Sequence, residues 1–222
     1  MTFDAFVSAP CNAPALEAAL HAAVDPGSGA LYLFGPAGAG KTHLLRAIEH
    51  RIASTRPELS LIRVNADVFL AQAVHAGLRS RREEFEETYR QADVLLLDDL
   101  QFLEDKETAW SVVQNICREF IQQDRLVVVT SDHPPLDPFF SRFQAIPMDT
   151  PDALACRQII EAMAQGMDLT LAPEVVDLVA DSAQGNLCRG KGILKRLLAF
   201  RDLMDLPPTP ENTARILADF RN

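Results

Sequence analysis

A phosphate-binding loop pattern constrains the fold of this chain more than any other feature of its sequence. Residues 35–42 fit the pattern G-x-x-x-x-G-K-[ST] and directly follow the apolar run 31–34, which predicts a strand–loop–helix unit. The glycines let backbone N–H groups point inward as an anion-binding nest, and the next helix presents its positive end to the same anion. We therefore predict a nucleotide phosphate site rather than a plain glycine-rich turn. Its residues are Gly35, Pro36, Ala37, Gly38, Ala39, Gly40, Lys41, Thr42 and His43.

Two carboxylates after a buried strand form the second strong signal. The uninterrupted apolar run 94–97 ends in Asp98 and Asp99, at the strand end where ligands gather in open α/β sheets. Asp98 and the Thr42 hydroxyl are predicted to hold Mg²⁺, and Asp99 to orient the attacking water. Lys41 is predicted to reach the outer phosphates. The alternative is that the two carboxylates merely open a solvated loop.

Two further polar residues follow later apolar runs. Asp132 comes just after the run 126–130, at the same predicted edge of the sheet, and could touch the γ-phosphate or the attacking water. A turn-capping Asp before Pro134-Pro135 would have the same position. Arg142 lies just before the last apolar stretch, where an arginine could act on the nucleotide of a neighbouring subunit. A lone surface arginine would look the same.

The order of apolar runs and helical patterns predicts an α/β fold. Apolar runs that suit buried parallel strands lie near 30–34, 61–64, 94–97, 126–130 and 145–146. Helical patterns separate the first four runs, including one from 67 to about 90, and Pro134-Pro135 predicts a loop before the last run. Beyond residue 150 only helical patterns remain, near 152–166, 173–184, 188–203 and from 211 onward. We predict a parallel sheet covered by helices over 1–150 and a small all-α domain over 151–222.

Composition narrows the functional classes. The chain of 222 residues carries a formal net charge of −10, which argues against a duplex-DNA binder that works through a general basic surface. The densest basic spot is 79–82, Arg-Ser-Arg-Arg; such a cluster is usually a solvated face. The four cysteines form no C-x-x-C pair, and no apolar run reaches membrane-spanning length. We therefore expect a soluble cytoplasmic protein with reduced thiols.

In combination these motifs resemble the AAA+ ATPases and, within them, the bacterial replication initiator (DnaA) family. The matching segments are 3–7, 35–48, 83–90, 94–102, 130–135 and 141–143. The resemblance implies a P-loop nucleotide-binding core with a helical lid, which binds ATP or ADP with Mg²⁺. It also implies that Asp132 lies in the sensor 1 region and that Arg142 is an arginine finger. Arg189 falls one place after the sensor 2 arginine position, where this chain has Cys188.

Departures from the family pattern shape the predicted function. An initiator would continue beyond Asn222 into a helix-turn-helix, so we expect a chain without a duplex-reading module, similar to the Hda-type regulators. Met1–Asp4 leaves no room for the sliding-clamp motif that is usual in that group. The family's basic loop, implicated in contact with single-stranded DNA, keeps only Lys106.

These resemblances lead to one leading expectation and two alternatives. We expect a nucleotide-dependent regulator or assembly factor in replication initiation, a weak ATPase used as a switch. Its partner would be another AAA+ subunit, either a second copy or a replication initiator. The first alternative is a helicase loader or transposition helper that grips a replicative helicase or single-stranded DNA, with the 79–82 cluster in its favour. The second is a small-molecule P-loop kinase.

Overall fold

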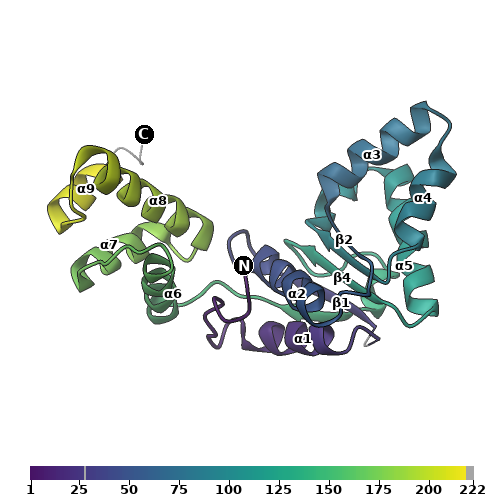
Figure 1. The fold of residues 1–222 in the computed structure, drawn as a ribbon, viewed down its shortest axis with the longest axis horizontal. Helices are drawn as coiled ribbons and strands as arrows, with labels where there is room; N and C mark the ends of the chain where they lie inside the picture. Colours follow the sequence, from purple (N-terminus) through teal and green to yellow (C-terminus); the bar gives the residue numbers. More distant parts are fainter. Residues whose placement is uncertain (28, 219–222) are drawn as a thin grey trace. The chain divides into compact units, whose positions relative to one another are not determined.

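The structure of the protein, a computed structural model, describes residues 1–27 and 29–218 (Figure 1). The chain divides into two compact units. The first unit contains Met1–Phe6, Ala13–Gly35 and Lys41–Met148, and the second contains Val7–Asn12, Pro36–Gly40 and the chain from Asp149 onward. Each unit is described by itself below.

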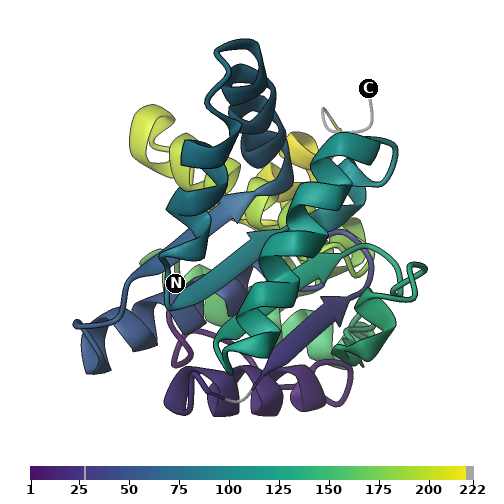
Figure 2. The ribbon, with the colours of Figure 1, turned by 90° about the vertical axis from the view of Figure 1, so that its right-hand side faces the viewer.

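The first unit is built on a five-stranded parallel sheet. Its strands are β1 (Ala30–Phe34), β2 (Leu61–Asn65), β3 (Val94–Asp98), β4 (Leu126–Ser131) and β5 (Gln144–Pro147), in the spatial order β2-β3-β4-β1-β5. The predicted α/β class with a parallel sheet is confirmed, and the strand arrows run in a common direction in Figure 2. Because parallel strands end at one edge, the carboxyl ends of β1, β3 and β4 lie close together.

Helices cover both faces of this sheet. On one face α1 (Ala13–Val24) packs on α2 (Lys41–Thr55), and α2 packs on the central strands. On the other face lie α3 (Ala66–Leu78), α4 (Arg82–Arg90) and α5 (Glu107–Gln122). Alternate strand residues such as Leu95 and Val127 share one buried cluster with Phe69 and Phe120 of these helices. The period-2 alternation of strand side chains therefore places apolar groups on both faces.

The helical pattern predicted from 67 to about 90 forms two helices, because the chain turns within it. Helix α3 ends at Leu78 and α4 begins at Arg82. Ser80 between them has φ 55°, a left-handed conformation that interrupts a right-handed helix. The turn lets α3 fold back on α4, where the ring of Phe69 lies 5.2 Å from that of Phe85. Burial of aromatic surface between the two helices stabilises the turn relative to one long helix.

The second unit is helical apart from its short N-terminal segments. It contains α6 (Ala153–Gln165), α7 (Pro173–Ala183), α8 (Leu187–Met204) and α9 (Pro210–Ala218). These helices share a core of their own that includes Ile160, Val179 and Leu194. The helix expected from Glu211 onward is α9, and residues 219–222 of that prediction lie outside the described residues. Glycine normally weakens a helix, but Gly190 inside α8 leaves room for α6, since a Cβ there would lie 2.4 Å from the Ile160 side chain.

The state of the cysteines and the apolar character of the helices bear on two expectations from the sequence. All four cysteines are free thiols, and Cys117 and Cys156 are buried. Within residues 1–27 and 29–218, no helix has the length and apolar character needed to cross a membrane.

Candidate nucleotide-binding site

The loop between β1 and α2 has the backbone conformation of a phosphate nest. Gly35, Gly38 and Gly40 have φ values of 151°, 86° and 107°, which L-residues with side chains rarely adopt. A Cβ on Gly35 would lie 2.0 Å from the carbonyl oxygen of Met148, so only glycine fits this approach. The loop leads directly into α2 at Lys41, whose helix leaves its first N–H groups without helical partners. The geometry suits an anion at the start of α2.

Lys41 is held in the loop. Its side chain is buried, and its Nζ donates to the carbonyl oxygen of Gly35 at 2.5 Å. A buried ammonium group needs hydrogen-bond partners because desolvation penalises the charge. The contact holds the ammonium group at the carbonyl of Gly35, the first residue of the loop, and its binding to an outer phosphate remains a prediction.

The two carboxylates at the end of β3 lie in different environments. Asp98 is the last residue of β3 and only 4% exposed, and burial raises the pKa of its carboxyl. Hydrogen bonds from the Thr130 and Thr42 hydroxyls lower the pKa of Asp98, and the charge of Asp99 raises it. The bond from Thr130 Oγ1 to Asp98 Oδ1 measures 2.6 Å. Asp99, half-buried, begins the turn that follows.

The structure links the phosphate loop to the acid pair through Thr42. This residue lies in the first turn of α2, and its hydroxyl is among the groups that lower the pKa of the Asp98 carboxyl. A carboxylate and a hydroxyl are hard oxygen donors of the kind that Mg²⁺ takes while it keeps several waters. The donor set that the structure brings together therefore fits the predicted Mg²⁺ ligands.

Two residues that sequence reasoning did not single out contact the acid pair. Thr130 of β4 and Asn65 of β2 flank β3 on its two sides, since β2-β3-β4 are neighbours in the sheet. Asn65 donates from Nδ2 to Asp99 Oδ2 at 3.2 Å, and its own Oδ1 caps α3 by accepting from the N–H of Asp67. The sequence feature that could have indicated both residues is that each is a polar residue at the carboxyl end of an apolar run.

Asp132 lies apart from this hydrogen-bonded group. Its side chain is exposed, with Oδ1 3.6 Å from Nε2 of His133, and the same nitrogen lies 3.1 Å from Glu104 Oε1. Thr130, two residues earlier, makes the contacts with Asp98 and Asp99. The predicted sensor role of Asp132 remains a prediction.

Arg142 is exposed at the end of a short 3-10 turn, Phe140–Arg142, that is anchored beneath it. Asp137 holds this turn: its carboxylate accepts from the N–H of Phe139 at 2.7 Å and from Trp110 Nε1 at 3.0 Å. Phe140 is buried in the core of the first unit. An exposed guanidinium fits an arginine that acts on a neighbouring subunit and also an ordinary surface arginine, so the role of Arg142 remains a prediction.

The N-terminal arm reaches the start of α2. The Nε2 atom of His43 lies 3.0 Å from the carbonyl oxygen of Thr2, and the Phe6 ring meets the His43 ring edge-on at 5.2 Å. The arm and the loop residue His43 thus form one surface beside the predicted phosphate site. In the second unit, Arg189 is exposed in the first turn of α8, where its N–H donates to the capping side chain of Asn186. A role for Arg189 in nucleotide binding remains a prediction.

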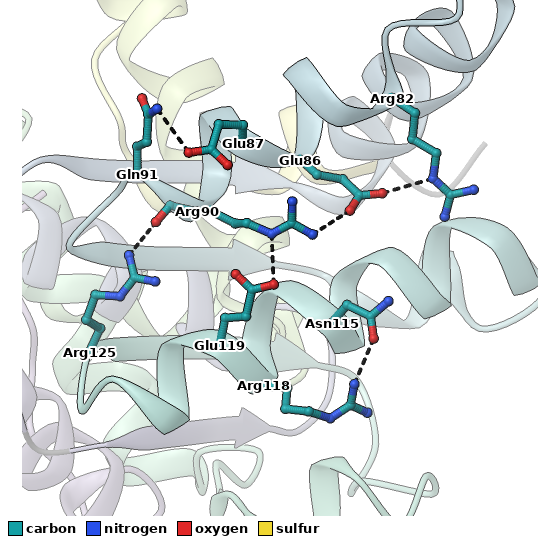
Figure 3. A network of polar contacts seen from close by, with 9 residues as sticks. All are labelled: Arg82, Glu86, Glu87, Arg90, Gln91, Asn115, Arg118, Glu119 and Arg125. Atoms are coloured by element: carbon teal, nitrogen blue, oxygen red, sulfur yellow. Dashed lines mark hydrogen bonds and ion pairs between the residues drawn. The ribbon is translucent and has the colours of Figure 1, made fainter.

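The arginine cluster at 79–82 is partly neutralised by α4. Arg82 pairs with Glu86 at 2.9 Å, and Glu86 also binds Arg90, which in turn contacts Glu119 of α5 at 2.8 Å (Figure 3). Arg81 lies 3.9 Å from Glu84. This network ties α4 to α5, and it leaves less free positive charge than the bare sequence suggested.

The sequence matches a family model over residues 1–144, which cover most of the first unit. That model is described as the bacterial DnaA ATPase domain. This chain belongs to the bacterial DnaA ATPase domain family. The strand order, the glycine loop and the acid pair described above are therefore features of a DnaA-type domain.

Individual relatives agree with the family assignment. The chromosomal replication initiator protein DnaA of Chloroflexus aggregans is 32% identical over 229 residues, which cover 98% of this chain and 48% of the relative. The chain thus spans about half the length of the curated relatives it matches. Among solved structures, domain III of DnaA from Thermotoga maritima has a TM-score of 0.93 at 29% identity, with 99% of this chain and 96% of that chain covered. A DnaA bound to AMPPCP and single-stranded DNA has a TM-score of 0.80 at 25% identity, with 92% and 67% covered.

Proposed function

We propose that this chain binds ATP or ADP with Mg²⁺ at residues 35–43 and acts as a nucleotide-dependent regulator or assembly factor in replication initiation, with slow hydrolysis. The observation that carries the proposal is the glycine nest at the start of α2, whose Thr42 hydroxyl lowers the pKa of the buried Asp98 carboxyl. A related DnaA structure holds AMPPCP, a non-hydrolysable ATP analogue, which supports the choice of nucleotide.

Each residue then has a defined role. Lys41 and the loop N–H groups bind the phosphates, and Thr42 with Asp98 holds the metal. Bound Mg²⁺ would neutralise charge on the β- and γ-phosphates. Asp99 orients the attacking water and accepts its proton. We further propose that Asp132 responds to the γ-phosphate and that Arg189 contacts the nucleotide.

Nucleotide binding is tested by titrating a fluorescent ATP analogue into the full chain with Mg²⁺. Lys41→Ala should weaken binding by about 2–5 kcal/mol, at least about 30-fold, because the phosphates lose a buried cationic partner. Lys106→Ala is the matched control, since it removes an exposed lysine of the same unit outside the loop. Unchanged affinity in Lys41→Ala would remove the basis of the site assignment.

The regulatory role requires a second AAA+ subunit. Arg142 is proposed to stabilise charge on that subunit's nucleotide, so adding this chain to a replication initiator should speed the initiator's ATP hydrolysis. Arg142→Ala should abolish the stimulation, whereas Arg46→Ala, which removes an exposed arginine of α2, should not. Stimulation that survives in Arg142→Ala would contradict this role. ATP turnover without an added acceptor would argue against the kinase alternative.

Single-stranded DNA binding is a second candidate because a related DnaA structure contains it. In this chain the candidate contacts are Arg79, which is exposed and makes none of the described ion pairs, and Lys106 at the start of α5. A gel shift with single-stranded DNA at low salt, with and without ATP, tests this function. The absence of any shift under both conditions would exclude it.

A further inference from the structure

One hydroxyl group lies between the two carboxylates of the proposed site. Thr130 is fully buried near the end of β4, and its Oγ1 donates to Asp98 Oδ1 at 2.6 Å. The same oxygen accepts the backbone N–H of Asp99 at 2.9 Å. A hydroxyl is the smallest side-chain group that donates and accepts at once. A valine of the same shape would fill the space and make neither bond.

The backbone of Asp99 requires such support. Its φ and ψ are 60° and 51°, a left-handed conformation that costs a non-glycine residue free energy and persists only where surrounding contacts enforce it. Two contacts from neighbouring strands do so: Thr130 binds the N–H of Asp99, and Asn65 binds its carboxylate at 3.2 Å. In this conformation the Asp99 carboxylate lies beside Asn65 at the end of β2.

We propose that Thr130 is a positioning residue that holds Asp99 in its left-handed turn and aligns the Asp98 carboxylate, so that both acidic groups of the site are set by one hydroxyl. The inference rests on the proposed function. Thr130 acts through the two carboxylates and is assigned no contact with the nucleotide. Its role therefore differs from the γ-phosphate response proposed for Asp132.

The first test needs no nucleotide. Thr130→Val removes the hydroxyl and keeps the shape, whereas Thr130→Ser keeps the hydroxyl. By NMR amide exchange on the full chain, the Asp99 N–H should exchange about tenfold faster in Thr130→Val, which corresponds to the loss of one hydrogen bond. It should exchange at the wild-type rate in Thr130→Ser, and the Leu97 N–H in the strand should change in neither variant. An unchanged Asp99 rate in Thr130→Val, or equal acceleration in both variants, would overturn the proposal.

The second test measures ATP hydrolysis in single turnovers. Thr130→Val should lower the hydrolysis rate about 10- to 100-fold, the scale expected when a reacting group is misplaced by about 1 Å. ATP affinity should change by less than about threefold, and Thr130→Ser should retain most of the rate. A wild-type rate in Thr130→Val would overturn the role. Failure of the wild-type chain to bind ATP would instead refute the proposed function, while amide exchange would still show whether Thr130 holds Asp99.

Discussion

Replacement of Asp137 by alanine should destabilise the first unit and loosen the turn that carries Arg142. The half-buried Asp137 carboxylate accepts three hydrogen bonds: from Trp110 Nε1 at 3.0 Å, from Gln114 Nε2 at 2.9 Å and from the Phe139 N–H at 2.7 Å. A hydrogen bond contributes about 0.5–1.5 kcal/mol to stability, so the three together should contribute about 3 kcal/mol. That loss is a large fraction of the stability of an ordinary domain.

Urea unfolding followed by tryptophan fluorescence is the direct measurement. Trp110 is the single tryptophan of the chain, and its indole N–H makes one of the lost bonds, so the probe lies at the perturbed contact. Asp105→Ala is the matched control: Asp105 is exposed and makes none of the described hydrogen bonds or ion pairs. It should change the free energy of unfolding by less than about 0.5 kcal/mol.

A loss below about 1 kcal/mol in Asp137→Ala would refute this reasoning. It would mean that the buried Phe140 and Phe143 hold the turn by packing alone. If the loss is as large as expected, Asp137→Ala should also reduce the stimulation of a neighbouring subunit's hydrolysis, because Arg142 would no longer be held in one place.

Three further predictions follow from local geometry. A hydrogen bond with the Pro134 carbonyl raises the pKa of His133, and the nearby carboxylates raise it further. The charged imidazole therefore stabilises the folded protein below the pKa of His133 in the unfolded chain, and this stabilisation is lost as the pH rises through the pKa of His133 in the folded protein. His133→Gln should therefore lower the free energy of unfolding more at about pH 5.5 than at about pH 8, by less than about 1 kcal/mol because the side chain is partly exposed; equal losses at both pH values would contradict this. Gly35→Ala should sharply lower the melting temperature measured by circular dichroism, since the added Cβ would collide with the Met148 carbonyl. Gly77→Ala lies inside α3 with open space around the new Cβ, and it should raise stability by about 0.5–1 kcal/mol; a fall would show that the α3–α4 turn needs this glycine.

The sequence alone determined the parts of the protein whose signal is local. The glycine loop, the buried runs and the paired carboxylates are each contiguous in the chain, so their chemistry can be recognised without knowledge of the fold. The parallel direction of the first four strands also followed, because helical patterns long enough to cross the sheet separate them in the chain. The predicted bounds of the strand at 30–34 agree with β1.

Only the tertiary structure decided which side chains from separate strands meet. Thr130 and Asn65 lie 31 and 34 residues from Asp99 in the chain, yet both bind it because β2, β3 and β4 are neighbours that end at one edge. The order of residues along the chain does not show which residues of different strands lie side by side. It therefore indicated Asp98 and Asp99 but not Thr130 and Asn65, which contact them. The same reason explains the turn at Ser80, which depends on aromatic packing between α3 and α4 that no local pattern records.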